Sequence, residues 1–275
     1  MKNFFVAAPL LFSKQLTEPT ALILSAAAFA LFSLLSSSVY LVNDLFDIEK
    51  DKTHPKKRHR PIASGQLPVN VARSAAALFI VVSLGLSLFL GLPFFSYAAS
   101  YLVLNLAYSL ALKHLPVLDV LSIATGFLLR VLAGAAAIAV PASFWLLVCT
   151  FVLACYLGFG KRAHELASST GEIRIQRPVL ARYHLSFLSV ILWVLAVATC
   201  VLYALYTVSH HTRHFFGTTR LLYTTPFAVI GVVRFLQLVR SQTAESPTDA
   251  MLRDIIFMAN LFVWAIAVVL IIYFV

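Results

Sequence analysis

Long apolar runs, interrupted by short clusters of charged, proline or glycine residues, dominate this chain. One helical crossing of a bilayer needs about 20 apolar residues, so 275 residues with short connections allow roughly eight to ten crossings. Each crossing should be an α-helix, because a bilayer leaves no partner for unpaired backbone groups. The expected segments lie near residues 3–13, 20–45, 69–91, 93–112, 117–140, 142–165, 183–208, 219–240 and 252–274. The sequence therefore predicts an all-α, polytopic transmembrane bundle of about nine helices, the first one short, in a single domain over residues 1–275.

The composition excludes the main alternatives to a membrane protein. Apolar residues make up 61% of the chain and charged residues 12%, and the mean hydropathy is +0.91. A soluble domain has about 25% charged residues, and this chain lacks the polar side chains to cover its surface. Cys149, Cys155 and Cys200 lie in apolar runs without C-x-x-C spacing, which excludes a disulfide scaffold.

The basic residues divide unevenly between alternate connections, and the excess of 21 Lys and Arg over 11 Asp and Glu is typical of loops that face the cytoplasm. Nucleic acid is therefore not expected as a partner. Three basic residues lie in the odd-numbered connections: Lys14, Arg213 and Arg220. Fourteen lie in the even-numbered ones: Lys50, Lys52, Lys56, Lys57, Arg58, Arg60, Lys113, Lys161, Arg162, Arg174, Arg177, Arg182, Arg240 and Arg253. This asymmetry predicts a plasma (inner) membrane protein with its N-terminus inside and its C-terminus outside.

An acidic stretch follows the second apolar segment and begins at Asn43. At about 100° per residue, Asp44, Asp47 and Asp51 fall within roughly 60° of one another on a helix, whereas Glu49 points nearly the opposite way. Three carboxylates on one face repel each other unless a cation neutralises them, and Mg²⁺ binds such oxygens while sharing its shell with substrate phosphates. We expect a Mg²⁺ site here; the alternative is an acidic helix end that pairs with the Lys and Arg residues after it.

A basic run comes directly after the acids and ends in a Pro-x-x-x-Gly turn over residues 61–65. Its Lys57, Arg58 and Arg60 could simply anchor a cytoplasmic loop. Beside bound Mg²⁺, however, such groups suit a substrate that carries pyrophosphate, since Arg forms bidentate contacts with phosphate oxygens.

Together the two stretches resemble the first aspartate-rich motif of the UbiA superfamily of intramembrane prenyltransferases. They read Asn43-Asp44-x-x-Asp47-x-x-x-Asp51 and Lys57-Arg58-x-Arg60-Pro61-Ile62-Ala63-x-Gly65. Further stretches are similar to its decaprenyl-phosphate phosphoribosyltransferase branch. They are Tyr108-Ser-Leu-Ala-Leu-Lys113-His114, Asp119, Leu129-Arg130-x-x-Ala133-Gly134, Gly160-Lys161-Arg162-x-x-Glu165-Leu166 and the opening Lys2-Asn3. The likeness covers nearly the whole chain and implies the superfamily's helical fold.

One departure from the superfamily's pattern bears on the substrate. Prenyltransferases of this superfamily usually carry a second Asp-x-x-x-Asp, where this chain has Lys161-Arg162-Ala163-His164-Glu165. Two acidic clusters suit an isoprenyl diphosphate with two Mg²⁺ ions, whereas fixed positive charge suits a donor with a second, separate phosphate. Phosphoribosyl pyrophosphate is such a donor. The resemblance therefore implies Mg²⁺-dependent transfer of 5-phosphoribose to a polyprenyl phosphate, with release of pyrophosphate, for lipid-linked pentose synthesis in the cell envelope.

Roles for individual residues follow from this reading. Asp44, Asp47 and Asp51 are expected to hold Mg²⁺ and the diphosphate, with Asn43 in support, and Lys161, Arg162 and Lys113 to contact phosphate oxygens. Glu165 either orients Lys161 from one turn away or contacts a ribose hydroxyl. The other expected substrate-binding residues are Lys57, Arg58, Arg60, Tyr108, Asp119 and Arg130.

Arg130 lies deep in the fifth predicted segment, where an ionisable group normally faces a bundle interior or a wet cavity. It is expected to contact phosphate, or Asp119 and its neighbours, or else to cap carbonyl groups between helices. Gly126 and Gly134 are expected to permit close packing of helices rather than to touch substrate.

Two other functions stay open at this point. A prenyltransferase of the same fold would join an isoprenyl diphosphate to an aromatic or lipid acceptor, and it predicts the second acidic pair that is missing here. A transporter that uses Arg130 and the acids for coupling predicts charged or broken helices in corresponding positions of two halves. A homo-oligomeric state is also left open.

Overall fold

The structure, a computed structural model, describes residues 2–53, 57–168, 179–241 and 246–274. Across these ranges it is helical, with twelve α-helices, short 3₁₀ segments and no strand, which confirms the predicted all-α fold class. The chain divides into two compact units, residues 1–142 and 143–275. The single domain over residues 1–275 stays a prediction. The described residues do not include three of the basic residues that the even-numbered connections contain: Lys56, Arg174 and Arg177.

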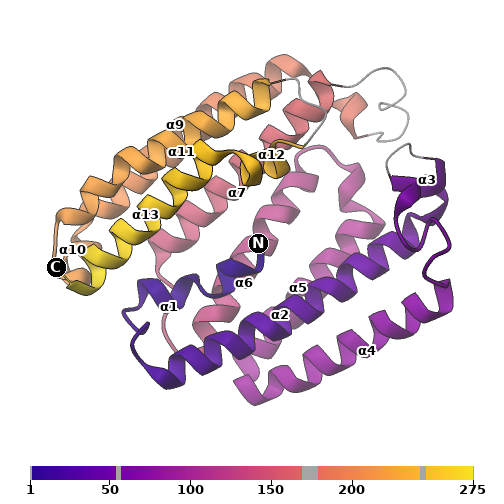
Figure 1. The fold of residues 1–275 in the computed structure, drawn as a ribbon, viewed down its shortest axis with the longest axis horizontal. Helices are drawn as coiled ribbons and strands as arrows, with labels where there is room; N and C mark the ends of the chain where they lie inside the picture. Colours follow the sequence, from indigo (N-terminus) through magenta and orange to yellow (C-terminus); the bar gives the residue numbers. More distant parts are fainter. Residues whose placement is uncertain (1, 54–56, 169–178, 242–245, 275) are drawn as a thin grey trace. The chain divides into compact units, whose positions relative to one another are not determined.

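The first unit is a bundle around α2 (Figure 1). Helix α2 packs against α4, α5, α6 and the 3₁₀ segment η1, and α5 packs against α6. A core of apolar side chains joins these helices, with Phe32 in contact with the rings of Phe94 and Tyr101. The elements are η1 (Lys2–Val6), α1 (Ala8–Phe12), α2 (Pro19–Phe46), α3 (Ile48–Thr53), η2 (Lys57–His59), α4 (Val69–Ser87), η3 (Leu88–Leu90), α5 (Leu92–Leu110), η4 (Leu112–His114) and α6 (Leu118–Ala137).

The N-terminal segment η1 approaches α6 closely at one glycine of that helix, Gly134. A Cβ atom at Gly134 would lie 1.8 Å from the carbonyl oxygen of Val6, so only glycine lets η1 approach α6 this closely. This confirms the packing role expected for Gly134. At Gly126, by contrast, an added Cβ would meet only ordinary contacts, the nearest at 3.6 Å.

The second unit packs α7 against α9 and α11, and α11 against α12 and α13. The buried Tyr156 hydroxyl of α7 donates to the Val232 carbonyl of α11, 2.9 Å away, and its ring contacts Phe235. The elements are α7 (Phe144–Ala167), η5 (Leu180–Arg182), α9 (Leu185–Val208), α10 (His210–Phe216), η6 (Arg220–Thr224), α11 (Thr225–Arg240), α12 (Pro247–Arg253) and α13 (Ile255–Phe274).

Seven helices of the described chain are long and apolar enough to cross a membrane, fewer than the nine crossings expected. The first predicted segment corresponds to Lys2–Phe12, which is apolar but too short. The fourth corresponds to α5, where serine, tyrosine and asparagine side chains lower the mean hydropathy. The seven spans are Pro19–Phe46, Val69–Leu90, Leu118–Ala137, Phe144–Ala167, Leu185–Val208, Arg220–Arg240 and Ile255–Phe274.

Candidate active site

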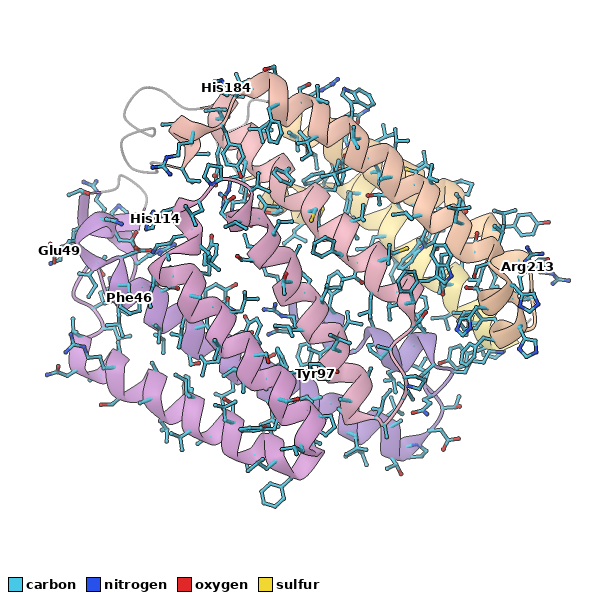
Figure 2. All side chains as sticks on the ribbon, turned by 180° about the vertical axis from the view of Figure 1, so that it is seen from behind. Phe46, Glu49, Tyr97, His114, His184 and Arg213 are labelled. Carbon is cyan, nitrogen blue, oxygen red and sulfur yellow. The ribbon has the colours of Figure 1, made fainter. Side chains whose placement is uncertain are left out.

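The three aspartates lie where one helix ends and the next begins. Asp44 is in the last turn of α2, Asp47 follows that helix, and Asp51 is in α3. The Asp47 amide donates to the Asn43 carbonyl at 3.0 Å and the Asp51 amide to the Asp47 carbonyl at 2.8 Å, so the helical spacing continues across the break. Glu49 projects away from the bundle (Figure 2), with 83% of its side chain exposed, and binds Lys52. This confirms that Glu49 points away from the other acids.

Arg60 joins two of the aspartates through a single nitrogen. Its Nη1 donates to Asp44 Oδ1 at 2.7 Å and to Asp51 Oδ2 at 2.8 Å, so the two carboxylate oxygens lie within about 5.5 Å of each other. Asp51 is 2% exposed, and the Lys57 ammonium lies 3.7 Å from its other oxygen. A buried carboxylate is costly unless it is paired, and these two cations provide the pairing.

Backbone hydrogen bonds close the turn that directly follows Arg60. The Arg60 carbonyl accepts the Ser64 amide and the Pro61 carbonyl accepts the Leu67 amide. Gly65 has φ +81°, in the region that favours glycine, which confirms the predicted Pro-x-x-x-Gly turn. The turn is anchored by Ile62, which is buried.

The third aspartate has a separate partner on the connection between α5 and α6. Lys113 of η4 binds both oxygens of Asp47, at 2.8 and 3.0 Å, and both side chains are largely shielded from solvent. One turn earlier in α5, the Ser109 hydroxyl donates to Asn43 Oδ1 at 3.2 Å. These bonds hold the end of α2 against α5 and bring Asn43, Asp47 and Lys113 together.

The three carboxylates divide between two basic side chains in this structure, and their binding of one shared cation stays a prediction. Asp44 and Asp51 share Arg60, whereas Asp47 lies with Lys113, because each acid has a basic side chain within reach. In the described part of the chain, no group of three or more His, Cys, Asp or Glu side chains could hold a metal ion by itself. The Asp44 and Asp51 oxygens nevertheless fit one hard cation, since a guanidinium nitrogen already lies between them. Mg²⁺ typically takes one or two carboxylates and completes its shell with water and substrate phosphates.

Other predicted residues of the first unit lie around this cluster. Arg58 is exposed and its Nε donates to the ring of His59. Tyr108 is half-buried on α5, and Asp119 is fully buried in the first turn of α6, an end where a helix favours negative charge. Beside Lys113, partial burial and the nearby lysines lower the pKa of His114 below its ordinary value.

Arg130 is buried inside the first unit, but it does not reach Asp119. The two residues are eleven positions apart on α6, which is about 16 Å of helix. The Arg130 guanidinium donates instead to Asn3 Oδ1 at 2.9 Å, to the Tyr101 hydroxyl at 2.8 Å and to the Gly126 carbonyl at 2.9 Å, and it lies over the Tyr101 ring. The expected contact with Asp119 is wrong, and the one carbonyl that Arg130 binds, that of Gly126, belongs to the same helix rather than to a neighbouring one.

Two partners of Arg130 were not found from the sequence. Asn3 is 127 residues away, and its only signal was the resemblance of Lys2-Asn3 to an opening motif. Tyr101 lies one turn before Asn105 on α5, and no local pattern distinguishes it from an ordinary core aromatic residue.

In the second unit, Lys161, Arg162 and Glu165 lie in the last two turns of α7. The Arg162 Nη1 donates to Glu165 Oε2 at 2.7 Å, and the Arg162 side chain is only 5% exposed. Glu165 thus pairs with Arg162. The pairing of Glu165 with Lys161 and the phosphate contacts of both basic residues stay predictions.

Similarity to known proteins supports one family. The family model of the UbiA prenyltransferases matches residues 3–273. The chain is 33% identical over 243 residues to a decaprenyl-phosphate phosphoribosyltransferase of Mycolicibacterium smegmatis, covering 86% of this chain and 76% of that protein. It is 31% identical over 252 residues to the enzyme of the same name from Corynebacterium glutamicum, covering 90% and 75%.

Solved structures agree on the fold. A UbiA homologue from Archaeoglobus fulgidus bound to GPP and Mg²⁺ superimposes with a TM-score of 0.70 at 16% identity, over 97% of this chain and 93% of that one. The same protein bound to Cd²⁺ gives 0.69 at 16% identity, over 98% and 95%. The chain is a member of the UbiA prenyltransferase family of integral membrane transferases.

Proposed function

We propose that this protein is a polyprenyl-phosphate phosphoribosyltransferase. It moves 5-phosphoribose from phosphoribosyl pyrophosphate to a polyprenyl phosphate of the decaprenyl type and releases pyrophosphate. The observation that carries this proposal is the similarity to two decaprenyl-phosphate phosphoribosyltransferases over 86% and 90% of the chain. The replacement of the usual second acidic pair by Lys161 and Arg162 supports the same donor, which has a phosphate separate from its diphosphate.

The first part of the proposed site binds the diphosphate of the donor. Asp44 and Asp51, whose oxygens both accept hydrogen bonds from Arg60, would hold Mg²⁺ together with Asp47, the third predicted ligand. The bound Mg²⁺ supplies charge neutralisation and polarises the diphosphate leaving group. The Arg60 side chain, at 37% exposure, is the most exposed of the side chains paired with these two acids, and it would be available to phosphate oxygens of the donor.

Other residues of the first unit position the reactants. Asp47 keeps Lys113 beside the acids through two short hydrogen bonds, so that the ammonium is available to a second phosphate oxygen. Asn43 is held by Ser109 and fixes the end of α2. We assign Lys57, Arg58, Tyr108, Asp119 and Arg130 to substrate binding as well, and Lys161, Arg162 and Glu165 of the second unit to the phosphate at C5 and the ribose.

The reaction needs little acid–base chemistry from the protein. The phosphate oxygen of the lipid attacks ribose C1, the bond from C1 to the diphosphate breaks, and pyrophosphate leaves with the electron pair. Because the nucleophile is already an anion, no strong general base is required. The work of the side chains is positioning and charge stabilisation of an oxocarbenium-like centre at C1.

The proposed setting is the plasma membrane, with the N-terminus inside and the acids at the cytoplasmic face. The basic residues of the even-numbered connections support this orientation. The lipid tail lies in the bilayer, and its product serves lipid-linked pentose synthesis for the cell envelope. A homo-oligomer remains part of the proposal, and the mass of the purified protein in detergent tests it.

The competing function is transfer of an isoprenyl group, which the family's description as prenyltransferases favours. The test supplies reconstituted protein with polyprenyl phosphate, Mg²⁺ and either labelled phosphoribosyl pyrophosphate or labelled isoprenyl diphosphate. We expect label in the lipid phase from the ribose donor alone. Label from the isoprenyl donor alone would replace the proposed activity with prenyl transfer.

A further inference from the structure

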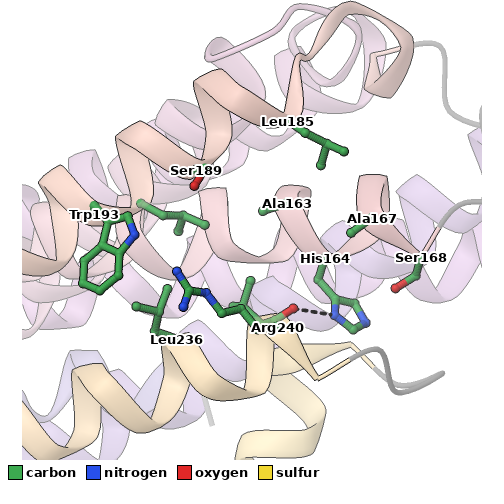
Figure 3. Close-up of a pocket in the computed structure, with 11 residues that line it drawn as sticks. Ala163, His164, Ala167, Ser168, Leu185, Ser189, Trp193, Leu236 and Arg240 are labelled. Carbon is green, nitrogen blue, oxygen red and sulfur yellow. Dashed lines mark hydrogen bonds between the residues drawn. The ribbon is translucent and has the colours of Figure 1, made fainter.

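A cavity of about 290 Å³ lies inside the second unit, between α7, α9 and α11 (Figure 3). This volume is near the lower end of the range for small-molecule pockets, about 300–1,000 Å³. Its walls are largely apolar, with Leu192, Leu236 and Val239 almost fully buried. The polar groups that line it are Ser168, Ser189, His164 and Arg240, together with the indole of Trp193.

Arg240 brings a full positive charge to this cavity. It is exposed, and its guanidinium lies over the ring of Trp193, 5.3 Å from the centroid. Among the residues that the structure describes, no carboxylate pairs with Arg240, in contrast to Arg60 and Arg162. A guanidinium beside apolar walls, without an acid of its own, is a complementary partner for an anion.

The wall that α7 contributes to the cavity is held against α11. His164 Nδ1 donates to the Val239 carbonyl at 3.1 Å, which binds α7 to the last turn of α11 and sets the ring's orientation. His164 is 5% exposed and Ala163 is 8% exposed, so the wall formed by α7 is a packed surface. The α7 side of the cavity is therefore packed, whereas Arg240, Trp193 and Ser189 lie at exposed positions.

The cavity lies at one end of the span Arg220–Arg240, where the interface between lipid headgroups and hydrocarbon is expected. Arg240 is the last residue of the span Arg220–Arg240, and Trp193 is eight residues into α9, about 12 Å from the beginning of that helix. Trp and Arg are the side chains that favour this interface. Beyond it, Val190 and Val194 of α9 are 64% and 59% exposed, a surface suited to acyl chains.

We propose that this cavity binds the headgroup of an anionic membrane phospholipid. The lipid phosphate accepts hydrogen bonds from Arg240, the glycerol region rests against Trp193 and Ser189, and the acyl chains run along the exposed apolar face of α9. A zwitterionic headgroup fits less well, because its own cation would lie close to the guanidinium. The inference does not depend on the proposed transferase function, since none of the acids near Arg60 takes part.

Native mass spectrometry of the purified protein in detergent tests this proposal. Phosphatidylglycerol and phosphatidylcholine with identical acyl chains are titrated against the wild-type protein, Arg240→Gln and Trp193→Leu. We expect one tightly bound phosphatidylglycerol, with an affinity about tenfold higher than that for phosphatidylcholine, as a charge-assisted contact supplies. Arg240→Gln should abolish this preference and Trp193→Leu should reduce it severalfold.

A matched control is Arg73→Gln. Arg73 is also an exposed arginine near the end of a helix, in the first turns of α4, but it does not line the cavity. The preference for phosphatidylglycerol should survive this change. Equal loss in Arg73→Gln and Arg240→Gln, or an unchanged preference in Arg240→Gln, would overturn the proposal.

Two competitors identify the source of the phosphate. Glycerol 3-phosphate, which lacks acyl chains, should not displace the bound phosphatidylglycerol at the same concentration, and displacement would contradict a lipid site. A polyprenyl phosphate that displaces it more strongly than phosphatidylglycerol itself would show that the cavity holds the acceptor lipid, which also contradicts the proposal.

Discussion

Replacing Gly134 with alanine should loosen the N-terminal segment from the first unit. The new Cβ would lie 1.8 Å from the Val6 carbonyl oxygen and 2.8 Å from the Val6 carbonyl carbon. Carbon atoms pack comfortably at about 3.5–4.0 Å, so the backbone of η1 has to move by about 1 Å or more. Backbone cannot rotate away as the end of a flexible side chain can.

The size of the effect follows from three contributions. Alanine in a helix gains about 1 kcal/mol over glycine. Overpacking costs about 1–3 kcal/mol. Moving η1 also strains the bonds from Arg130 to Asn3 and from Asn3 to Ser33, each worth about 1 kcal/mol and more where a charged group takes part. Together these predict a loss of about 2–4 kcal/mol in the free energy of unfolding.

Gly126→Ala on the same helix is the matched control. Its added Cβ meets Arg130 Nη1 at 3.6 Å and Tyr101 at 3.7 Å, which are ordinary contacts. Thermal unfolding in detergent, followed by intrinsic fluorescence, should show a Tm lower by roughly 5–10 °C for Gly134→Ala and no decrease for Gly126→Ala. Equal Tm values for the two variants would refute the close approach of η1 to α6.

Three further outcomes test the site and the second unit. Asp51→Asn should reduce turnover at least a hundredfold, because the carboxylate that Arg60 now binds would no longer help to hold a divalent cation, while Glu49→Gln, an exposed acid two positions away, should keep its rate. Lys161→Gln should raise the KM for phosphoribosyl pyrophosphate roughly tenfold and leave kcat within twofold, as loss of a charged hydrogen bond predicts; an unchanged KM would remove Lys161 from the site. The hydrogen bond from Arg234 holds the pKa of Asp254 below its ordinary value of 3.8, so this pair stabilises the protein above about pH 4 and the contribution is lost as the pH falls through the lower pKa. Asp254→Asn should lower Tm at pH 7 and flatten its decrease in acid, and an acid profile identical to wild type would contradict this.

The sequence predicted the helices well because membrane spans are set by length and hydropathy. Predicted segments such as 69–91 and 183–208 correspond to Val69–Leu90 and Leu185–Val208 within a few residues. The number of membrane crossings was predicted less well than the positions of the helices. The Lys2–Phe12 segment is apolar yet short, and whether it crosses the bilayer depends on tertiary packing that periodicity does not report.

The common side of the three aspartates was predicted from the sequence, but their pairing with basic residues was not. Helical spacing placed Asp44, Asp47 and Asp51 on one side, and the structure keeps that spacing across the helix break. The break itself, and the division of the acids between Arg60 and Lys113, depend on contacts between segments up to 66 residues apart. Local patterns identify which residues carry charge, whereas the fold decides which charges meet.

The hydrogen-bond partners of Arg130 also could not be predicted from local sequence patterns. Arg130 was expected to contact Asp119 or a phosphate; it lies too far from Asp119, its bonds go to Asn3 of η1 and Tyr101 of α5, and the phosphate contact stays a prediction. A buried arginine satisfies its donors with whichever acceptors the bundle brings near, and a hydroxyl or an amide serves as well as a carboxylate.

The most direct test of the proposed activity is the mass of the lipid product. Wild-type protein and Asp51→Asn are reconstituted in vesicles and incubated with polyprenyl phosphate, phosphoribosyl pyrophosphate and Mg²⁺, and the extracted lipids are analysed by mass spectrometry. The account predicts a polyprenyl phosphate heavier by one phosphoribosyl group from the wild-type protein, and none from Asp51→Asn or in the presence of a chelator. A wild-type protein that yields only unchanged polyprenyl phosphate, or an equal amount of product from Asp51→Asn, would contradict it.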